Sequence, residues 1–208
     1  MKNTNQSLFD KYEMIKDLGT GSSGSVTLVR HISMDQERAL KKVPKASAFA
    51  ESALSEARLL KSLEHPSIPR IFDFEEDNAF YYIVEEYIDG ETLDSFLLHQ
   101  QLISPGLFFN ICEQLCNVFI YLHTQISTPI IYRDLKPEHI IVCHNKLKLI
   151  DFGVSAYVIQ DGNNFNHYGN IEFSAPECFT EDTITPAADI YSLGQLLQYI
   201  LTFTPDSF

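Results

Sequence analysis

The stretch YRDLKPEH, residues Tyr132–His139, is followed directly by the apolar run IIV at 140–142 and decides the fold. A second polar stretch, IDFG at Ile150–Gly153, ends the apolar segment that begins at residue 146. Charged side chains set between buried strands cost free energy unless a ligand or a metal uses them. One aspartate can accept a proton from a hydroxyl nucleophile while the other binds magnesium, and phosphoryl transfer needs this division of roles.

A glycine-rich stretch, GTGSSGSV at Gly19–Val26, lies upstream between two predicted strands. A glycine motif that opens a helix would indicate a dinucleotide site, whereas one between strands forms a flap whose backbone amides can approach phosphates. On its own, this stretch is equally well explained as an ordinary turn rich in glycine and serine.

Two adjacent lysines follow on the next predicted strand. Strand side chains alternate between faces, so only one of them can share the face of the small Ala39, and we choose Lys41. A buried ammonium needs a carboxylate. Glu56 is the best-placed partner because its apolar neighbours face inward, although other glutamates such as Glu51 could serve.

The chain changes from a strand-rich part to a helix-rich part, which predicts an α+β fold with two lobes. Residues 12–87 are rich in β-type runs and form a small antiparallel sheet lobe with one helix, predicted within residues 51–64. Residues 88–208 form a mainly helical lobe, and a cleft between lobes is a common place for ligands. The predicted strands are 26–30, 38–43, 68–74 and 80–87, then 130–131, 140–142 and 146–150, and the later helices are 104–123 and 187–201.

Composition excludes several classes of protein. The chain has 208 residues, 15 Lys and Arg and 28 Asp and Glu, so its formal charge of −13 disfavours nucleic acid as a partner. No apolar run approaches the length of a membrane helix, which predicts no membrane segment and a cytoplasmic location. The four cysteines lack a paired CxxC spacing and three of them sit in apolar surroundings, so we expect small buried hydrophobes in a reducing compartment rather than zinc ligands: Cys112, Cys116, Cys143 and Cys178.

Taken in order, these motifs resemble a eukaryotic-like serine/threonine protein kinase domain, and the compact lobes resemble bacterial members. Four further motifs match in sequence order, namely HPSI at 65–68, EEYIDG at 85–90, SAPE at 174–177 and DIYSLG at 189–194. The resemblance implies a two-lobed kinase fold that transfers the γ-phosphate of ATP to Ser or Thr hydroxyls of protein substrates. Mg²⁺ is the implied metal.

The same resemblance implies a role for individual residues. Lys41, held by Glu56, would contact the α- and β-phosphates, Asp134 would be the catalytic base, and Lys136 would contact the γ-phosphate. Asp151 would bind magnesium. The implied nucleotide-binding residues are Leu18, Gly19, Thr20, Gly21, Ser22, Ser23, Gly24, Ser25, Val26, Ala39, Lys41, Glu86, Ile88 and Ile141.

Three positions depart from the family pattern. His139 stands where the family has an asparagine that binds the second magnesium, and an imidazole suits a softer ion such as Mn²⁺ better. Glu85 stands where an apolar or small residue is usual, and Asn170 where a threonine is usual. These departures keep open a pseudokinase that acts as a nucleotide-binding or scaffolding module. A small-molecule phosphotransferase of kinase-like fold is a third reading, although such proteins normally lack the DLKPE and APE signatures.

Measured against the family, the chain covers the small lobe and the large lobe only through the helix after DIYSLG. We therefore expect it to be incomplete at the C-terminus. Glu177 of SAPE ordinarily pairs with an arginine in the part that would follow, so its partner is expected to be missing.

Overall fold

The computed structural model describes residues 8–21, 24–100, 102–157, 170–180 and 184–203. The chain divides into two units. The first holds residues up to Glu64 together with Pro69–Tyr87, and the second holds His65–Ile68 and the chain from Ile88 onward. Four residues, HPSI, thus belong to the second unit although the chain on both sides of them belongs to the first.

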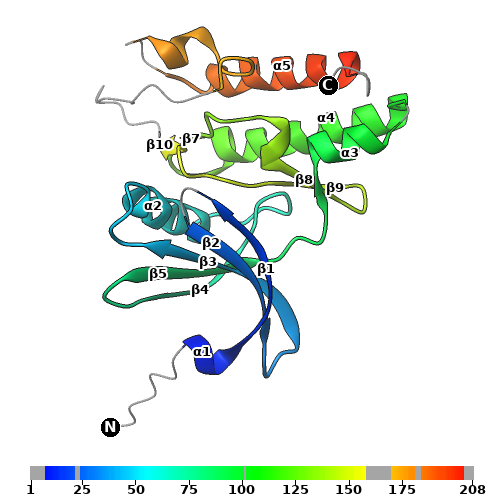
Figure 1. Cartoon of the computed structure of the whole chain (residues 1–208). Coiled ribbons are helices and arrows are strands. Elements are labelled where there is room, and N and C mark those ends of the chain that lie inside the picture. Colours follow the sequence, from blue (N-terminus) through cyan, green and yellow to red (C-terminus); the bar gives the residue numbers. More distant parts are fainter. Residues whose placement is uncertain (1–7, 22–23, 101, 158–169, 181–183, 204–208) are drawn as a thin grey trace. The chain divides into compact units, whose positions relative to one another are not determined.

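The first unit is built on a five-stranded antiparallel sheet with the strand order β1-β2-β3-β5-β4 (Figure 1). Its strands are β1 (Tyr12–Gly21), β2 (Gly24–His31), β3 (Gln36–Pro44), β4 (Ile71–Glu76) and β5 (Phe80–Glu86), and its helices are α1 (Leu8–Lys11) and α2 (Ala50–Lys61). The register pairs β3 with both neighbours, so Lys41 lies between Val26 on β2 and Ile83 on β5.

Helix α2 forms because its apolar positions fall on one face. Ala53, Ala57 and Leu60 are buried at three- and four-residue spacing. An acidic residue in the first turn and basic residues in the last turn suit the helix dipole. Ala53 and Ala57 pack against Val43 and Ile83 of the sheet, so this helix covers one of its faces.

The opposite end of the first unit is closed by the short helix α1. Leu8 is fully buried in a cluster with Tyr12, Val29, Leu40 and Tyr82. Salt bridges from Lys11 to Asp73 at 2.8 Å and to Glu75 at 3.2 Å attach this segment to β4. The sequence pattern did not predict α1.

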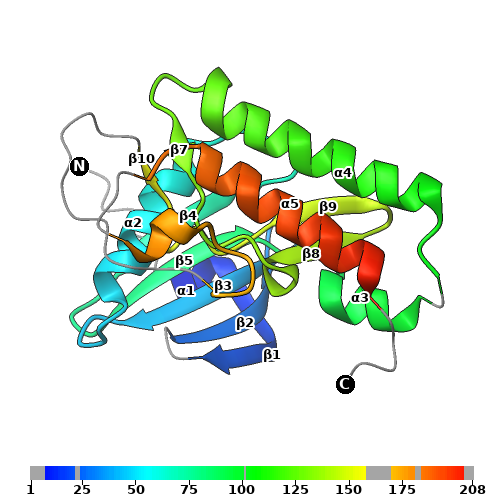
Figure 2. The ribbon, with the colours of Figure 1, turned by 90° about the horizontal axis from the view of Figure 1, so that it is seen from above.

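The second unit combines helices with short strand pairs. Its elements are β6 (Glu91–Thr92), α3 (Leu93–His99), α4 (Pro105–Ile120), β7 (Ile130–Ile131), β8 (Ile140–Cys143), β9 (Lys146–Leu149), β10 (Ala156–Tyr157) and α5 (Ala187–Thr202). Strands β6, β8 and β9 form one antiparallel sheet, and β10 pairs with β7. Figure 2 shows α4 and α5 running alongside one another.

Sequence reasoning located most of these elements but missed some boundaries. Ser104 caps α4 by accepting a hydrogen bond from the Leu107 amide, as its position predicts. The helix ends at Ile120, three residues before the predicted end, and continues as one π-helical turn over Tyr121–Gln125. The strand predicted from Ile68 begins only at Ile71. The predicted α+β fold class is confirmed.

Across the part of the chain that the structure describes, no helix has both the length and the apolar character that spanning a membrane requires.

Candidate active site

In the first unit, Lys41 and Glu56 form an ion pair. The Lys41 Nζ lies 2.7 Å from Oε2 of Glu56, and the two side chains are 16% and 8% exposed. The neighbouring Lys42 points to the other face, where its Nζ lies 4.0 Å from the centre of the Phe80 ring. The structure therefore pairs the lysine that strand alternation predicted, while Glu51, the alternative partner, is exposed.

The glycine-rich stretch joins β1 and β2, which are antiparallel and pair Gly21 with Gly24. Gly24 adopts φ +148°, and a Cβ at this position would lie 2.1 Å from the carbonyl oxygen of Lys42. Only glycine fits this approach of β2 to β3. Two predicted binding residues, Ser22 and Ser23, lie outside the described residues.

Other predicted nucleotide-binding residues of the first unit lie on the same sheet. Leu18, Gly19 and Thr20 are on β1, and Ser25 and Val26 are on β2. On β5, Glu85 lies opposite Ala39 of β3 and Ile71 of β4, so a carboxylate shares the sheet face of the small Ala39. The Glu86 amide donates to the carbonyl of Arg70 at 2.9 Å.

In the second unit, Ile88 and Ile141 belong to two segments that approach each other closely. A Cβ on Gly90 would lie 2.4 Å from the carbonyl oxygen of Val142 and 2.8 Å from Cγ2 of Ile141. The glycine therefore lets the segment after Ile88 lie against β8.

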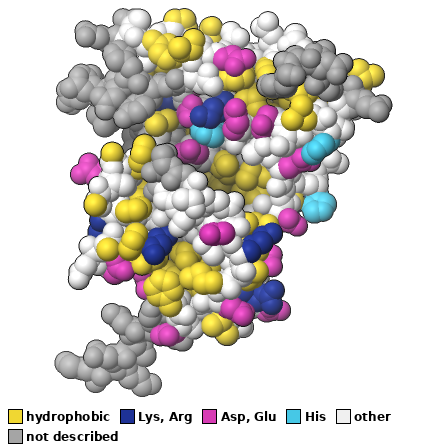
Figure 3. All heavy atoms as spheres, in the orientation of Figure 1, with side chains coloured by type: hydrophobic (Ala, Val, Ile, Leu, Met, Phe, Trp, Pro, Cys, Tyr) yellow, Lys and Arg dark blue, Asp and Glu magenta, His cyan; other side chains and the backbone are white. Residues whose placement is uncertain are grey.

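Asp134 and Lys136 form the second ion pair of the predicted site. The Lys136 Nζ lies 3.0 Å from Oδ2 of Asp134, with 24% and 18% of the side chains exposed. Both groups are therefore accessible to a ligand while remaining paired. Figure 3 shows acidic, basic and histidine side chains gathered on the face of the second unit that it draws.

His139 connects the two aspartates. Its Nδ1 lies 3.0 Å from the carbonyl oxygen of Asp134, and its Nε2 lies 3.4 Å from Oδ2 of Asp151. A carbonyl oxygen only accepts, so Nδ1 carries the hydrogen, and in the neutral ring Nε2 presents its lone pair toward Asp151. Two acceptors face each other there, an arrangement that a cation between them would stabilise.

Asp151 follows β9 with a left-handed backbone, φ +61°. Its Oδ1 accepts a hydrogen bond from the Gly153 amide at 3.3 Å, while Oδ2 faces His139. The preceding loop carries a second such residue, Arg133, with φ +76°. Non-glycine residues in this region cost free energy and concentrate at functional sites.

A residue to which sequence reasoning gave no role holds the loop that carries Asp134. Asp189 of α5 is fully buried, and its carboxylate accepts hydrogen bonds at 2.8 Å from the amides of Tyr132 and Arg133. His123 donates a third at 2.8 Å. A carboxylate in the first turn of an otherwise apolar helix was the signal that could have found it, because such a group is rarely buried without donors.

Aromatic packing fixes the same loop from the other side. The rings of Tyr132 and Phe152 meet edge to face with centroids 5.0 Å apart, and both side chains are buried. The Tyr132 hydroxyl donates to the carbonyl of Ile150. The loop with Asp134 and the loop with Asp151 are therefore packed together within one unit.

The described residues contain no group of three or more His, Cys, Asp and Glu side chains arranged to hold a metal. Magnesium at phosphate-transfer sites is normally held by one or two protein ligands plus the substrate phosphates. Asp151 with His139 therefore fits the protein share of such a site. The imidazole lone pair is the unusual donor, since nitrogen suits Mn²⁺ better than Mg²⁺.

Comparisons with known proteins identify the class. A family model described as the protein kinase domain matches residues 12–207. The chain is 31% identical over 201 residues to the serine/threonine-protein kinase PrkC of Bacillus subtilis, covering 92% of this chain and 30% of PrkC. It is 30% identical over 215 residues to PknB of Mycolicibacterium smegmatis, covering 97% and 34%. With ppk25 of Schizosaccharomyces pombe it shares 33% identity over 188 residues, covering 88% and 44%.

The chain belongs to the protein kinase domain family, which confirms the resemblance drawn from its motifs. Enzymes of this family use ATP, a divalent metal and protein substrates. The chain spans less than half of the length of these three relatives.

Proposed function

We propose that this chain is an ATP-dependent protein kinase that transfers the γ-phosphate to Ser and Thr hydroxyls. One observation carries the proposal: four functional side chains lie on two loops that pack together, namely Asp134, Lys136, His139 and Asp151. The buried Asp189 fixes the first of these loops by accepting hydrogen bonds from its backbone. All three relatives described above are named serine/threonine-protein kinases, which supports the substrate class.

Asp134 is the proposed base. It accepts the proton of the substrate hydroxyl as that oxygen attacks the γ-phosphorus. A bond forms between the hydroxyl oxygen and phosphorus, the bond from phosphorus to the bridging oxygen breaks, and ADP leaves. Lys136, whose Nζ lies 3.0 Å from Oδ2 of Asp134, would provide a positive charge for the γ-phosphate.

Nucleotide binding is proposed for two groups of residues. In the first unit, Lys41 would contact the α- and β-phosphates, and its pairing with Glu56 fixes the ammonium in place. The glycine-rich hairpin would contribute backbone amides. The backbone of Glu86 and Ile88 would bind the adenine edge, and Val26, Ala39 and Ile141 its two faces.

Asp151 and His139 are the proposed metal ligands. A divalent metal would neutralise phosphate charge. Nδ1 of His139 is engaged by the Asp134 carbonyl, which orients Nε2 toward the Asp151 carboxylate. A nitrogen and an oxygen donor favour Mn²⁺ over Mg²⁺ more than the family's oxygen pair would.

The pseudokinase alternative rests on the same histidine. An imidazole that contacts both Asp134 and Asp151 occupies space near two groups that the reaction requires. This alternative predicts nucleotide binding without phosphate transfer, so catalysis separates the two functions.

The test is transfer of radiolabelled γ-phosphate from ATP to a generic protein substrate, with Mg²⁺ or Mn²⁺, followed by phosphoamino acid analysis. Asp134→Asn should lower the rate by about 100-fold or more, as expected for loss of a general base. The matched control, Asp89→Asn at an exposed position, should leave it unchanged. Equal background rates for wild type and Asp134→Asn, with ATP still bound, would show a pseudokinase. Phosphotyrosine as the sole product would reject the Ser/Thr assignment.

A further inference from the structure

Helix α4 of the second unit carries two cysteines that have no role in the proposed function. Cys112 and Cys116 are both free thiols, the first half-buried and the second exposed. The sequence predicts buried thiols at all four cysteines, but only Cys178 is buried. The prediction is wrong for Cys116 because this residue follows Leu115 and so lies off the buried stripe of the helix. Cysteine is among the residues most often buried, so an exposed thiol beside a second one calls for an explanation.

The spacing of the two cysteines suits a shared ligand. Residues four apart on a helix lie on one side of it, with Cβ atoms about 5–6 Å apart. A metal–thiolate bond is about 2.3 Å long, so one ion can hold two sulfur atoms that are up to about 4.6 Å apart. Burial raises the pKa of the Cys112 thiol, and the charge of Cys116 raises it further, so the two groups are close enough to interact.

The helical turn that carries both thiols is fixed in place. Gln114 lies between them in the sequence, and its Nε2 donates to the carbonyl of Asn145 at 2.9 Å. Its Oε1 accepts from the amide of Leu147 at 2.8 Å. These two hydrogen bonds tie the turn to the hairpin of β8 and β9. The separation of the thiols is therefore set before any ligand binds, which lowers the free-energy cost of binding.

The charge of the helix favours a cation. Glu113 is the one charged residue of α4, and it lies exposed between the two cysteines in the sequence. The chain as a whole has a formal charge of −13. A cation at the thiols therefore meets no lysine or arginine of the same helix.

The number of donors selects the kind of ion. Among the residues that the structure describes, no three His, Cys, Asp or Glu side chains are grouped so that they could hold a metal. Zn²⁺ in a protein normally takes four ligands, and Mg²⁺ takes oxygen donors. Two thiolates alone suit a soft ion that accepts two ligands in a line, and thiolates select Cu⁺ among the common soft ions.

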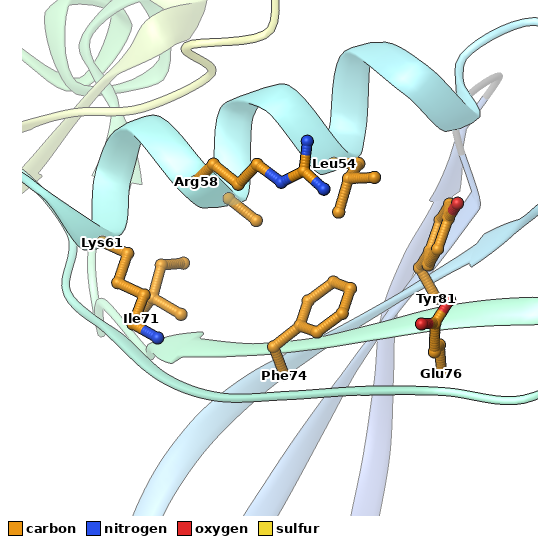
Figure 4. A pocket seen from close by; sticks show the side chains of 8 residues that line it. Leu54, Arg58, Lys61, Ile71, Phe74, Glu76 and Tyr81 are labelled. Atoms are coloured by element: carbon orange, nitrogen blue, oxygen red, sulfur yellow. The ribbon is translucent and has the colours of Figure 1, made fainter.

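The pocket beside α2 in the first unit offers no comparable set of donors. Figure 4 shows Leu54, Arg58 and Phe74 in its lining. Glu76, the carboxylate of that lining, is paired with Lys45 at 2.7 Å. A soft cation would find neither a thiol nor an imidazole there.

We propose that Cys112 and Cys116 together bind one Cu⁺ ion, at a site separate from the residues of phosphate transfer. Two S–H bonds break and two Cu–S bonds form as the ion binds. The ion brings one positive charge and displaces two protons, so the bound group carries a charge of −1. No electron is transferred.

The experiment uses the full 208-residue chain, fully reduced and free of oxygen, in competition with the chromophoric Cu⁺ chelator bathocuproine disulfonate. The chain should take one Cu⁺ from the chelator, and X-ray absorption should show two sulfur ligands. Cys112→Ser and Cys116→Ser should each weaken binding by about 100-fold or more, because one thiol loses the advantage of chelation. The control is Cys143→Ser, which removes the half-buried thiol beside His144 and should bind as the wild type does.

A second variant keeps the number of thiols and changes only their spacing. Cys116→Ser combined with Asn117→Cys moves one thiol to the next exposed position of the helix, out of line with Cys112. This double variant should bind Cu⁺ as weakly as Cys116→Ser does. Thermal melts without metal should show that every variant folds, and Cu⁺ should raise the melting temperature of the wild type and of Cys143→Ser alone.

Four results would overturn the proposal. They are failure of the folded, reduced wild type to take Cu⁺ from the chelator, equal affinity in the double variant, loss of affinity in Cys143→Ser, and one ion per two chains in a dimer seen by sedimentation. The last result would assign Cys116 to a contact between copies. Because the readouts are metal binding and melting, none of these results depends on whether the chain transfers phosphate.

Discussion

Nε2 of His139 lies 3.4 Å from Oδ2 of Asp151, while Nδ1 of the same ring is engaged by the carbonyl oxygen of Asp134 at 3.0 Å. One imidazole thus joins the two loops that carry the proposed base and the proposed metal ligand. In the neutral ring, a hydrogen on Nδ1 faces this carbonyl and leaves a lone pair on the nitrogen that faces Asp151.

Replacing this imidazole by an amide should change the metal preference. His139→Asn presents an oxygen beside Asp151, so Mg²⁺ should support ATP binding better relative to Mn²⁺ than in the wild type. Thermal-shift titrations of ATP with each metal measure the ratio of affinities. Electron spin echo spectra of bound Mn²⁺ should lose their histidine nitrogen coupling. His144→Asn, at an exposed position, is the control. An unchanged ratio together with absence of nitrogen coupling in the wild type would show that His139 is not a ligand.

The two adjacent lysines of β3 should behave differently. Lys41→Met removes the ion pair with the buried Glu56, so ATP affinity and thermal stability should both fall. Lys42→Met removes a cation above the Phe80 ring that also lies 5.9 Å from the centre of the Tyr82 ring, and such contacts are worth about 0.5–1 kcal/mol at exposed sites. Calorimetric titration with ATP and thermal melts compare the two variants. Similar losses in both would contradict the assignment of Lys41.

Asp189→Asn should destabilise the second unit. The amide cannot accept the three hydrogen bonds that the carboxylate accepts from Tyr132, Arg133 and His123. Breaking a buried, charged network of this kind costs about 3 kcal/mol. Urea unfolding measures the change, and Asp89→Asn at the surface serves as its control. A difference under about 1 kcal/mol would indicate that water replaces the lost partners.

Two glycines should respond to alanine with opposite signs. Gly24→Ala forces a Cβ toward the Lys42 carbonyl at φ +148°, which should cost roughly 1–3 kcal/mol. Gly194→Ala lies within α5 with nothing near its Cβ, so it should stabilise the protein by roughly 1 kcal/mol. Thermal melts decide the signs. A stabilising Gly24→Ala would mean that the hairpin shifts to accept the side chain.

Stability should rise with pH where His65 titrates. Burial lowers the pKa of His65 below its ordinary value of 6.5, and the Lys148 charge adds to the effect. The unfolded chain then binds more protons than the folded one below the ordinary pKa, so this stability is fully present above that value and is lost as pH falls from it through the lower pKa of the folded state. Protonation also removes the hydrogen bond that Nδ1 accepts from the Ser67 amide at 3.1 Å. Urea midpoints between about pH 5.5 and 7.5 should show a smaller slope for His65→Gln than for wild type. Identical slopes would remove His65 as the cause.

Sequence patterns predicted the parts of the fold in which periodicity is strong. Alternation on β3 selected Lys41 over Lys42, and helical spacing located α2 and α4. The patterns missed α1 because its four residues are too few to show a period, and its burial depends on long-range contacts such as Lys11 with Asp73. The family resemblance placed His139 at a metal-binding position, but only the structure shows its contact with Asp134 as well. Asp189 lacked a role because its three donors lie far from it along the chain.

Because the chain is synthesised from its N-terminus, Asp189 is made after the loop whose backbone it orders. Tyr132 and the carboxylate that orders its amide are separated by 57 residues. A nascent chain therefore emerges with the Asp134 loop complete in sequence but without the group that fixes its backbone. Contacts of such separation must close a longer loop than local ones do, and chains rich in them fold more slowly. Until α5 has been made and docked, the amides of Tyr132 and Arg133 lack this carboxylate as their acceptor.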